Sequence, residues 1–182
     1  MLIETPRLRL RSWADRHRAE FAELHADPEV MLDQGGPIGR AASDEKFDWY
    51  SDAFRRLGFS SWAVESHAGA FLGYAGVMPA ETPHPLGEHH EVVWRIKRSA
   101  WGHGYATEAA RAALRDVFAR ARLPIVFAYT APDNLRSQSV MNKLGLRRDP
   151  ARDFTHDYWN YPAWHGLVWV ATPEVTAAVT RE

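Results

Sequence analysis

The most regular pattern of apolar and polar positions in this chain runs through residues 106–121. Apolar side chains recur every three or four residues, and arginine and aspartate side chains fall on the opposite side. This spacing predicts an amphipathic helix, and its alanine-rich face would allow close packing against a sheet. The apolar positions are Ala106, Ala109, Ala110, Ala113, Leu114, Val117, Phe118 and Ala121.

Shorter patterns predict the other elements. Leucine and arginine alternate at the first expected strand, Asp15 is a candidate helix cap, and Gly58 and Gly145 are candidate helix ends. The expected helices cover residues 15–26, 41–57, 106–121 and 134–144. The expected strands cover residues 7–11, 61–65, 70–77, 91–96, 125–130, 146–154 and 166–171. The long helix joins two of these strands directly, which predicts one parallel crossover.

Composition narrows the class of protein. With 182 residues, 46% of them apolar, the chain is expected to form one domain over residues 1–182. Its 22 lysines and arginines against 23 acidic residues predict neither a nucleic-acid-binding surface nor a membrane-binding basic patch. The lack of cysteine excludes disulfides and thiol nucleophiles. With no signal-like start and no long apolar run, a cytoplasmic location is expected.

A glycine-containing loop immediately precedes the long helix. Gly102 and Gly104 lack Cβ atoms, so the backbone can turn tightly and come close to a ligand. The first N–H groups of a helix have no partner within the helix, and they attract anions. The loop is therefore a candidate cradle for a phosphate or pyrophosphate group.

Other known motifs fit this chain less well. A dinucleotide-binding loop would need a third glycine where Thr107 stands, and a P-loop would need a Gly-Lys-Ser/Thr sequence that is absent. Trp94 occupies the position at which a zinc-protease motif starting at His90 needs its second histidine, so no metal site is expected. The histidines considered as metal ligands are His84, His89, His90 and His103.

Two segments about 30 residues apart carry a resemblance to a known family. Residues 101–109 (WGHGYATEA) and 130–146 (TAPDNLRSQSVMNKLGL) resemble the GNAT superfamily of N-acetyltransferases, in particular the branch of ribosomal-protein N-terminal acetyltransferases. The resemblance extends over nearly the whole chain, starting from residues 4–13 (ETPRLRLRSW). It implies an α/β (α+β) fold: a mostly antiparallel, twisted sheet of six to seven strands with a central parallel crossover and about four helices.

The resemblance also implies the cofactor, acetyl-CoA, with coenzyme A as product and no metal. Two positions depart from the family pattern: Ser99 replaces a glutamine or arginine, and Met141 replaces a general-acid tyrosine. A side-chain contact to phosphate is then either missing or supplied by Arg98. The residues expected to bind the cofactor are Trp101, Gly102, His103, Gly104, Tyr105, Ala106, Asn134 and Ser137.

Three groups are candidates for the chemistry of acyl transfer. Glu91 matches a strand-borne glutamate that the family uses as a general base. Free Glu titrates near about 4.3 and an α-amine near about 7.7–8.0, so burial that raises the pKa of Glu91 would suit this role. Ser137 is the candidate general acid, and the resemblance implies that a strand amide near Val93 is the oxyanion donor. Glu91 as a solvated strand-end charge, and Ser137 and Asn134 as plain helix-start residues, stay open as alternatives.

The function expected from these features is transfer of an acetyl group from acetyl-CoA to a primary amine. The acceptor is either a protein N-terminal α-amine or a small-molecule amine. A rival function is a non-catalytic sensor or assembly protein that binds acetyl-CoA. The aromatic segment at residues 154–165 is a candidate for acceptor contacts, and the terminal hairpin is a candidate homodimer surface.

Overall fold

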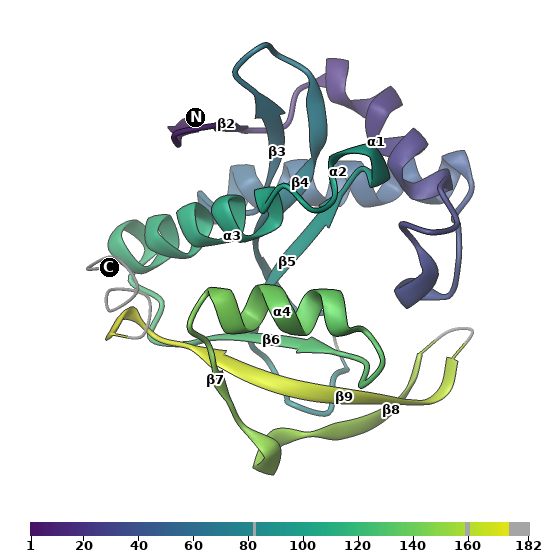
Figure 1. Ribbon diagram of the computed structural model, residues 1–182, viewed down its shortest axis with the longest axis vertical. Coiled ribbons are helices and arrows are strands. Elements are labelled where there is room, and N and C mark those ends of the chain that lie inside the picture. Colours follow the sequence, from purple (N-terminus) through teal and green to yellow (C-terminus); the bar gives the residue numbers. More distant parts are fainter. Residues whose placement is uncertain (82, 159–160, 175–182) are drawn as a thin grey trace.

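Nine strands form the sheet of the computed structural model, which describes residues 1–81, 83–158 and 161–174 (Figure 1). Their order is β1-β2-β3-β4-β5-β6-β9-β7, and β8 pairs separately with β9. The pairs are antiparallel except for β5 and β6, which are parallel. The strands are β1 (Leu2–Glu4), β2 (Leu8–Arg11), β3 (Ser61–Ser66), β4 (Phe71–Pro79), β5 (His90–Ile96), β6 (Val126–Thr130), β7 (Arg147–Arg148), β8 (Phe154–Tyr158) and β9 (Tyr161–Ala171).

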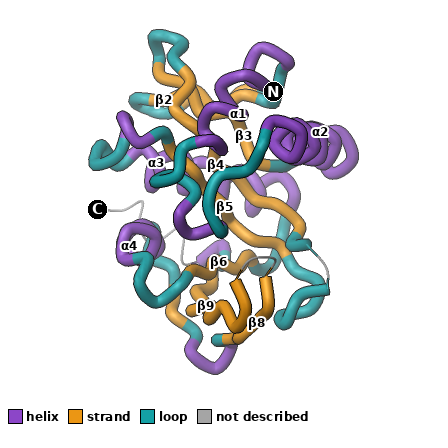
Figure 2. Tube along the Cα trace, turned by 90° about the vertical axis from the view of Figure 1, so that its right-hand side faces the viewer, coloured by secondary structure: helices purple, strands orange, loops and turns teal. Residues whose placement is uncertain are grey.

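Helices cover both faces of this sheet (Figure 2). One apolar cluster joins α1 and α2 to β3 and β4, with Phe21, Phe47 and Tyr74 among its buried members. A second cluster joins α3 and α4 to the other face, where Leu114 and Met141 are buried. The helices are α1 (Arg18–Ala26), α2 (Arg40–Leu57), α3 (Tyr105–Asp116) and α4 (Leu135–Lys143). The mixed α/β class and the parallel crossover predicted from the sequence are confirmed.

The parallel pair β5–β6 is the feature that makes room for a site. Among the described residues, Glu91 and Phe127 are the only register pair between these strands, whereas β6 pairs with β9 over five positions. Beyond Glu91 the two strands therefore diverge, although both belong to the same sheet. The helices that follow them, α3 after β5 and α4 after β6, line the side of the gap that faces the viewer in Figure 1.

The helix predicted at residues 106–121 is present, with one change at its end. The middle of its alanine face is fully buried, and contacts between α3 and β4 are close because these side chains are small. From Val117 to Ala121 the backbone widens into a π-helical turn, which ends at Arg122 with a φ of 54°. The buried positions of α3 are Ala109, Ala110, Ala113 and Leu114.

Two local predictions are wrong. Asp15 does not cap the first helix, because its carboxylate accepts from the Arg18 side chain and from no backbone N–H of the helix. The neighbouring Ala14 N–H is bound by Nδ1 of His17 at 3.1 Å. The strand expected at residues 146–154 is split into β7 and β8 by a 3₁₀ turn at Pro150–Arg152. This split and the short edge strand β1 raise the number of strands above the expected six to seven. None of the helices in the described part of the chain is long and apolar enough to span a membrane.

Candidate active site

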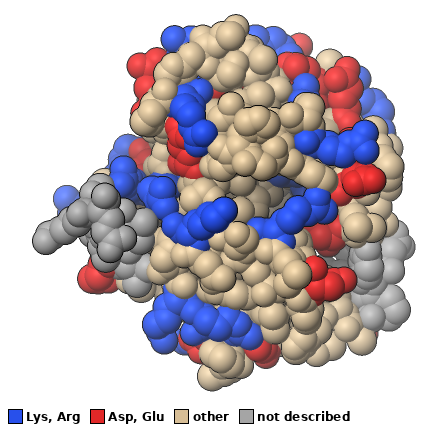
Figure 3. Space-filling model, viewed as in Figure 1, with Lys and Arg blue, Asp and Glu red and all other residues tan. Residues whose placement is uncertain are grey.

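A cavity of about 780 Å³ occupies the gap between β5 and β6. Its walls come from β5, the glycine loop, the start of α3, α4, and the segment that joins α1 to α2. In Figure 3 a hollow lies near the centre of the molecule, with lysine and arginine atoms on both of its sides. Residues on both faces of β5, such as Trp94 and Arg95, line the cavity, so the cavity passes through the sheet.

The glycine loop forms one wall of this cavity. Gly102 and Gly104 have φ values of 80° and 78°, a left-handed conformation in which a Cβ atom would be strained. The Trp101 indole donates to the Ile96 carbonyl at 2.7 Å and fixes the loop to the end of β5. Among the described residues, no acceptor binds the backbone N–H groups of residues 102–106. These donors fit the phosphate groups of acetyl-CoA.

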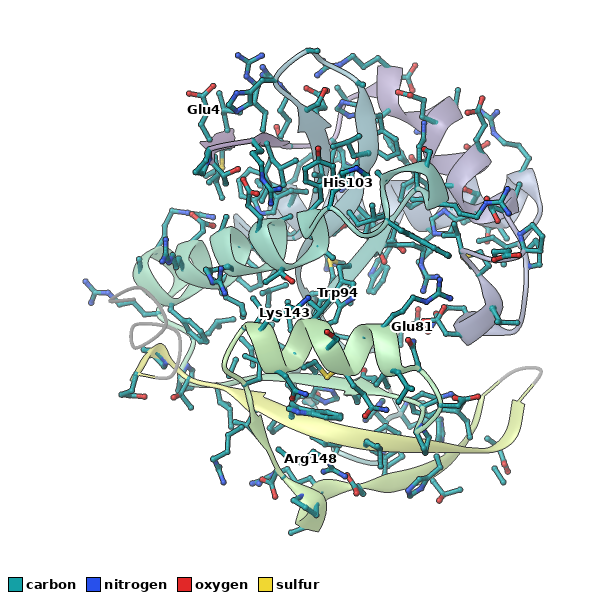
Figure 4. All side chains as sticks on the ribbon, viewed as in Figure 1. Glu4, Glu81, Trp94, His103, Lys143 and Arg148 are labelled. Atoms are coloured by element: carbon teal, nitrogen blue, oxygen red, sulfur yellow. The ribbon has the colours of Figure 1, made fainter. Side chains whose placement is uncertain are left out.

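The predicted loop residues lie at this wall, with one exception. Trp101, Gly102, Gly104, Tyr105 and Ala106 line the cavity. The ring of His103 instead stacks on the ring of Tyr105, and its Nδ1 bonds to the Trp101 carbonyl at 2.8 Å (Figure 4). The imidazole of His103 therefore faces the loop itself, and any contact with a ligand would use the backbone of this residue.

Two cations of α4, which sequence reasoning missed, line the cavity opposite the loop. The Arg136 guanidinium lies 4.0 Å from the centre of the Trp101 ring, and Lys143 lies two turns further along α4. Arg136 and Lys143 are seven residues apart, so they lie on one face of the helix. This spacing could have been recognised in the sequence. Arg98 does not line the cavity, and its guanidinium lies 3.8 Å from both Asp27 and Glu29, so a contact of Arg98 with phosphate stays a prediction. Arg136 and Lys143 are further candidates for phosphate contacts.

The start of α4 brings Asn134 and Ser137 to the cavity. The Asn134 side chain accepts from the Ser137 N–H at 3.1 Å, so Asn134 is the helix cap, and both residues line the cavity. The Asn134 amide also lies 3.5 Å from Asp33, which accepts from buried Arg95 at 3.0 Å. Through Arg95 and Asp33, the segment between α1 and α2 is tied to β5 at the far end of the cavity. The expected contact of Asn134 with cofactor stays a prediction.

Glu91 lies beside the cavity, partly buried on the sheet face that α2 covers. Burial raises the pKa of Glu91 to about 7, and the negative charge of Glu81 acts in the same direction. A hydrogen bond from Tyr129 and the charge of Lys46 oppose this change. Glu91 can therefore exchange a proton near neutral pH, which a solvated strand-end glutamate does not do. It is not among the residues that line the cavity.

The backbone N–H group that is available near Val93 is that of Trp94. Lys97 donates to Leu72 and Ala80 donates to His89, so the odd-numbered positions of β5 form the hydrogen-bonded pairs with β4. Val93 has the same parity, and its N–H therefore points to β4. The N–H of Trp94 points the other way, into the gap between β5 and β6. Trp94 itself lines the cavity, in the space between α3 and α4 (Figure 4).

The remaining candidate residues lie away from the reacting region. Met141 is only 1% exposed and packs in the core between α4 and the sheet, so its side chain does not enter the cavity. His84 and His89 pack on Tyr129, and burial lowers the pKa of both, that of His84 to about 4. In the described ranges no group of three or more potential metal ligands occurs.

The aromatic segment at residues 154–165 contributes one wall residue. Trp164 lines the cavity and lies near Phe154 and Tyr129. Residues 159–160 lie outside the described residues, and the predicted acceptor and dimer contacts of this segment stay predictions. Trp164 lies near Tyr129, which hydrogen-bonds to Glu91. This segment therefore contributes one side chain to the wall of the candidate site.

The family model of the acetyltransferase (GNAT) domain matches residues 7–147, which include β2, the glycine loop and α4. The chain belongs to this GNAT acetyltransferase family. Members of the family use acetyl-CoA as acetyl donor, and the loop amides and α4 cations of this chain suit that group.

Individual relatives agree with this assignment. The chain is 32% identical to the uncharacterized protein YkkB of Bacillus subtilis over 88% of this chain and 91% of the relative. It is 29% identical to the FsC-acetyl coenzyme A-N(2)-transacetylase of Aspergillus fumigatus, over 99% of this chain and 76% of that protein. The fold is similar to RimL, a ribosomal L7/L12 α-N-protein acetyltransferase solved in complex with coenzyme A. The TM-score is 0.77, with 12% identity over 96% of this chain and 99% of that one.

Proposed function

We propose that this GNAT protein is an N-acetyltransferase that moves the acetyl group of acetyl-CoA onto a primary amine. Residues 1–182 act as one acetyltransferase domain in this proposal. The observation that carries it is a cavity through the sheet that is lined by the glycine loop and by the cations of α4, with Glu91, whose pKa is about 7, beside the gap in the sheet. The amine attacks the thioester carbonyl directly, so a C–N bond forms and the C–S bond breaks.

Each step needs a group that this chain can supply. Acetyl-CoA, when bound, supplies an activated acetyl thioester. The N–H groups of residues 102–106, Arg136 and Lys143 hold its phosphates, and the Trp94 N–H donates to the developing oxyanion. Glu91 accepts the amine proton, and because it does not line the cavity, the proton passes through a water molecule. Ser137 passes a proton to the departing thiolate and takes one back from solvent, which receives the proton that Glu91 later releases.

Two relatives support an amine as acceptor, and they differ in its kind. The Aspergillus protein is named as an N(2)-transacetylase, and RimL is named as an α-N-protein acetyltransferase. An α-amine with a pKa near about 7.7–8.0 needs little help from a base with a pKa near 7, whereas lysine at about 10.4 needs far more. The acceptor proposed here is therefore an α-amine-like group on a peptide or a small molecule.

Turnover on a set of acceptors tests this function. Purified protein is incubated with acetyl-CoA and either peptides with free N-termini, the same peptides with blocked N-termini and one lysine, or small α-amines. Thiol release and the mass of the acceptor are measured together. Acetylated α-amines with no product from blocked peptides support the proposal. Tight binding of acetyl-CoA with no product from any acceptor would favour the non-catalytic sensor.

The Ser137→Ala variant is expected to lower kcat by about 10-fold, with a smaller rise in KM for acetyl-CoA because Ser137 is also expected to contact this cofactor. A thiol with a pKa near about 8.5 is already a fair leaving group, so the loss of a proton donor costs less here than in most acid-catalysed reactions. Steady-state rates at several pH values check this. Ser137→Thr keeps a hydroxyl and should retain most of the rate. An unaltered kcat and pH profile for Ser137→Ala would exclude Ser137 as the acid.

A further inference from the structure

The N-terminal segment reaches across the molecule to the glycine loop. Both Thr5 and Arg7 bind Glu108 in the first turn of α3, at 2.6 Å from the Thr5 hydroxyl and 2.6 Å from Arg7 Nε. The backbone N–H of Arg7 adds a bond of 3.0 Å to the same carboxylate. Arg7 also donates from its second guanidinium nitrogen to the His103 carbonyl at 2.8 Å. One arginine thus joins Glu108 to the loop between the two glycines.

The bond to His103 controls the direction of a neighbouring donor. In a planar trans peptide the carbonyl oxygen and the N–H of the next residue point to opposite sides. Because Arg7 holds the His103 carbonyl on its own side, the N–H of Gly104 is directed away from Arg7. Gly104 lines the cavity, whereas Arg7 does not. Arg7 therefore acts on the cavity only through the loop.

The same arginine compensates a charge that would oppose anion binding. Glu108 lies in the first turn of α3, beside the donors that face the cavity, and its side chain is 15% exposed. Burial acts to raise the pKa of Glu108. The hydrogen bonds from Thr5 and Arg7 outweigh this effect and hold the pKa below its ordinary value, so the carboxylate is ionised at neutral pH. An ionised group there repels phosphate unless a cation is paired with it. Arg7 provides that cation and also lies 5.0 Å from the centre of the Tyr105 ring.

We propose that Arg7, anchored by Glu108, is a positioning residue for the pyrophosphate part of acetyl-CoA. It holds the loop peptide between His103 and Gly104 in the orientation that presents an N–H group to phosphate, and it neutralises Glu108. The inference rests on the proposed function, because it takes acetyl-CoA as the ligand of the cavity. Preorganised donors bind more tightly than donors that must first be ordered, so Arg7 should affect affinity for the donor substrate and leave the chemical step intact.

The test compares two acetyl donors in wild-type protein and in Arg7→Ala. Acetyl-CoA carries the pyrophosphate, whereas S-acetylpantetheine carries the same thioester without it. For acetyl-CoA, Arg7→Ala is expected to raise Kd and KM about 10-fold with kcat within about two-fold. For S-acetylpantetheine, the ratio of kcat/KM between the variant and wild-type protein is expected to stay near one.

Arg9→Ala is the matched control. Arg9 lies two residues further along, in β2, and likewise binds one carboxylate, Glu4 at 3.1 Å, and one carbonyl, that of His67 at 3.2 Å. Arg9 is not part of the cavity wall, so Arg9→Ala should leave kcat/KM unchanged for both acetyl donors. Arg7→Gln, which keeps side-chain length and one N–H donor but loses the charge, is measured beside Arg7→Ala. Thermal unfolding of each variant separates folding defects from binding defects, so one poorly folding variant does not end the test.

The outcomes distinguish the two proposals. An Arg7 variant that folds and has a wild-type Kd for acetyl-CoA overturns the role of Arg7 and leaves the proposed function standing. An equal loss of kcat/KM with both donors also overturns it, because the pyrophosphate would then not be involved. Failure of the wild-type protein to bind acetyl-CoA overturns the proposed function, and the role of Arg7 with it.

Discussion

Replacing Glu91 with glutamine is expected to lower kcat/KM for the amine acceptor by about 10²- to 10⁴-fold near pH 8. Glutamine cannot accept the proton that leaves the amine, although it keeps the size of the side chain. The pKa of Glu91 is about 7, so the carboxylate is the dominant form above neutral pH and is lost as the pH falls through 7. Wild-type activity should therefore rise through pH 7, whereas Glu91→Gln should retain only the rise caused by deprotonation of the acceptor itself.

Glu81→Gln is the control for this experiment. Glu81 lies outside the cavity wall, and its negative charge helps to raise the pKa of Glu91. Removing that charge should lower the pKa of Glu91 and move the pH profile to lower pH, with the maximal rate retained. Unchanged turnover of Glu91→Gln at pH 7, with acceptor and donor saturating, would contradict the role of Glu91 as base.

The stability of the Glu91→Gln variant gives an independent check on the same residue. A carboxyl whose pKa is raised on folding binds its proton more tightly in the native state, so it favours the folded state most below its ordinary pKa of 4.5, and this stability is lost as the pH rises from there through 7. Glu91→Gln should therefore unfold at a higher temperature than wild-type protein at pH 8, with a smaller difference below pH 5. A large loss of activity in a more stable protein would point to chemistry and not to unfolding.

The second large effect is expected from Gly104→Glu, which should raise the Kd for acetyl-CoA more than about 100-fold. Any side chain at Gly104 must adopt a φ near 78°, which costs about 1–2 kcal/mol for an L-residue. The carboxylate adds a negative charge where the loop offers its N–H groups to phosphate. A Cβ at this position would also lie 3.5 Å from the Arg7 guanidinium, so the new carboxylate can compete with Glu108 for Arg7.

Gly104→Gln separates the effect of charge from the effect of backbone strain. Glutamine has nearly the same size and the same backbone requirement, but it carries no charge. Calorimetric titration of both variants with acetyl-CoA should show weaker binding for each, and clearly weaker binding for Gly104→Glu. Equal affinities for the two variants would mean that no phosphate lies near this loop.

Features with a local cause could be predicted from the sequence. The periodicity of α3 and the two left-handed glycines before it depend on neighbours within one or two turns, and the parallel crossover follows from the order strand–helix–strand along the chain. All three are present. The split between β7 and β8 and the short strand β1 could not be read in the same way. Strand β1 has only three residues and exists because it pairs with β2, and β7 and β8 share the long partner β9.

The same distinction holds for the site. Asn134 and Glu91 were expected from the resemblance to the family, and Ser137 from its place in the first turn of the helix that follows Asn134; their roles stay predictions. Arg7 and Glu108 are 101 residues apart in sequence, so no local pattern predicts their contact. Which N–H group near Val93 points into the gap depends on which edge of β5 pairs with β4, a property of the sheet as a whole.

Calorimetric titration of the wild-type protein with acetyl-CoA tests the central claim most directly. Coenzyme A, NAD and ATP are titrated under the same conditions. Saturable binding of acetyl-CoA and coenzyme A, with much weaker binding of NAD and ATP, is the result that this account predicts. Absence of binding by acetyl-CoA would contradict it, because the cavity between β5 and β6 would then have no role in acetyl transfer.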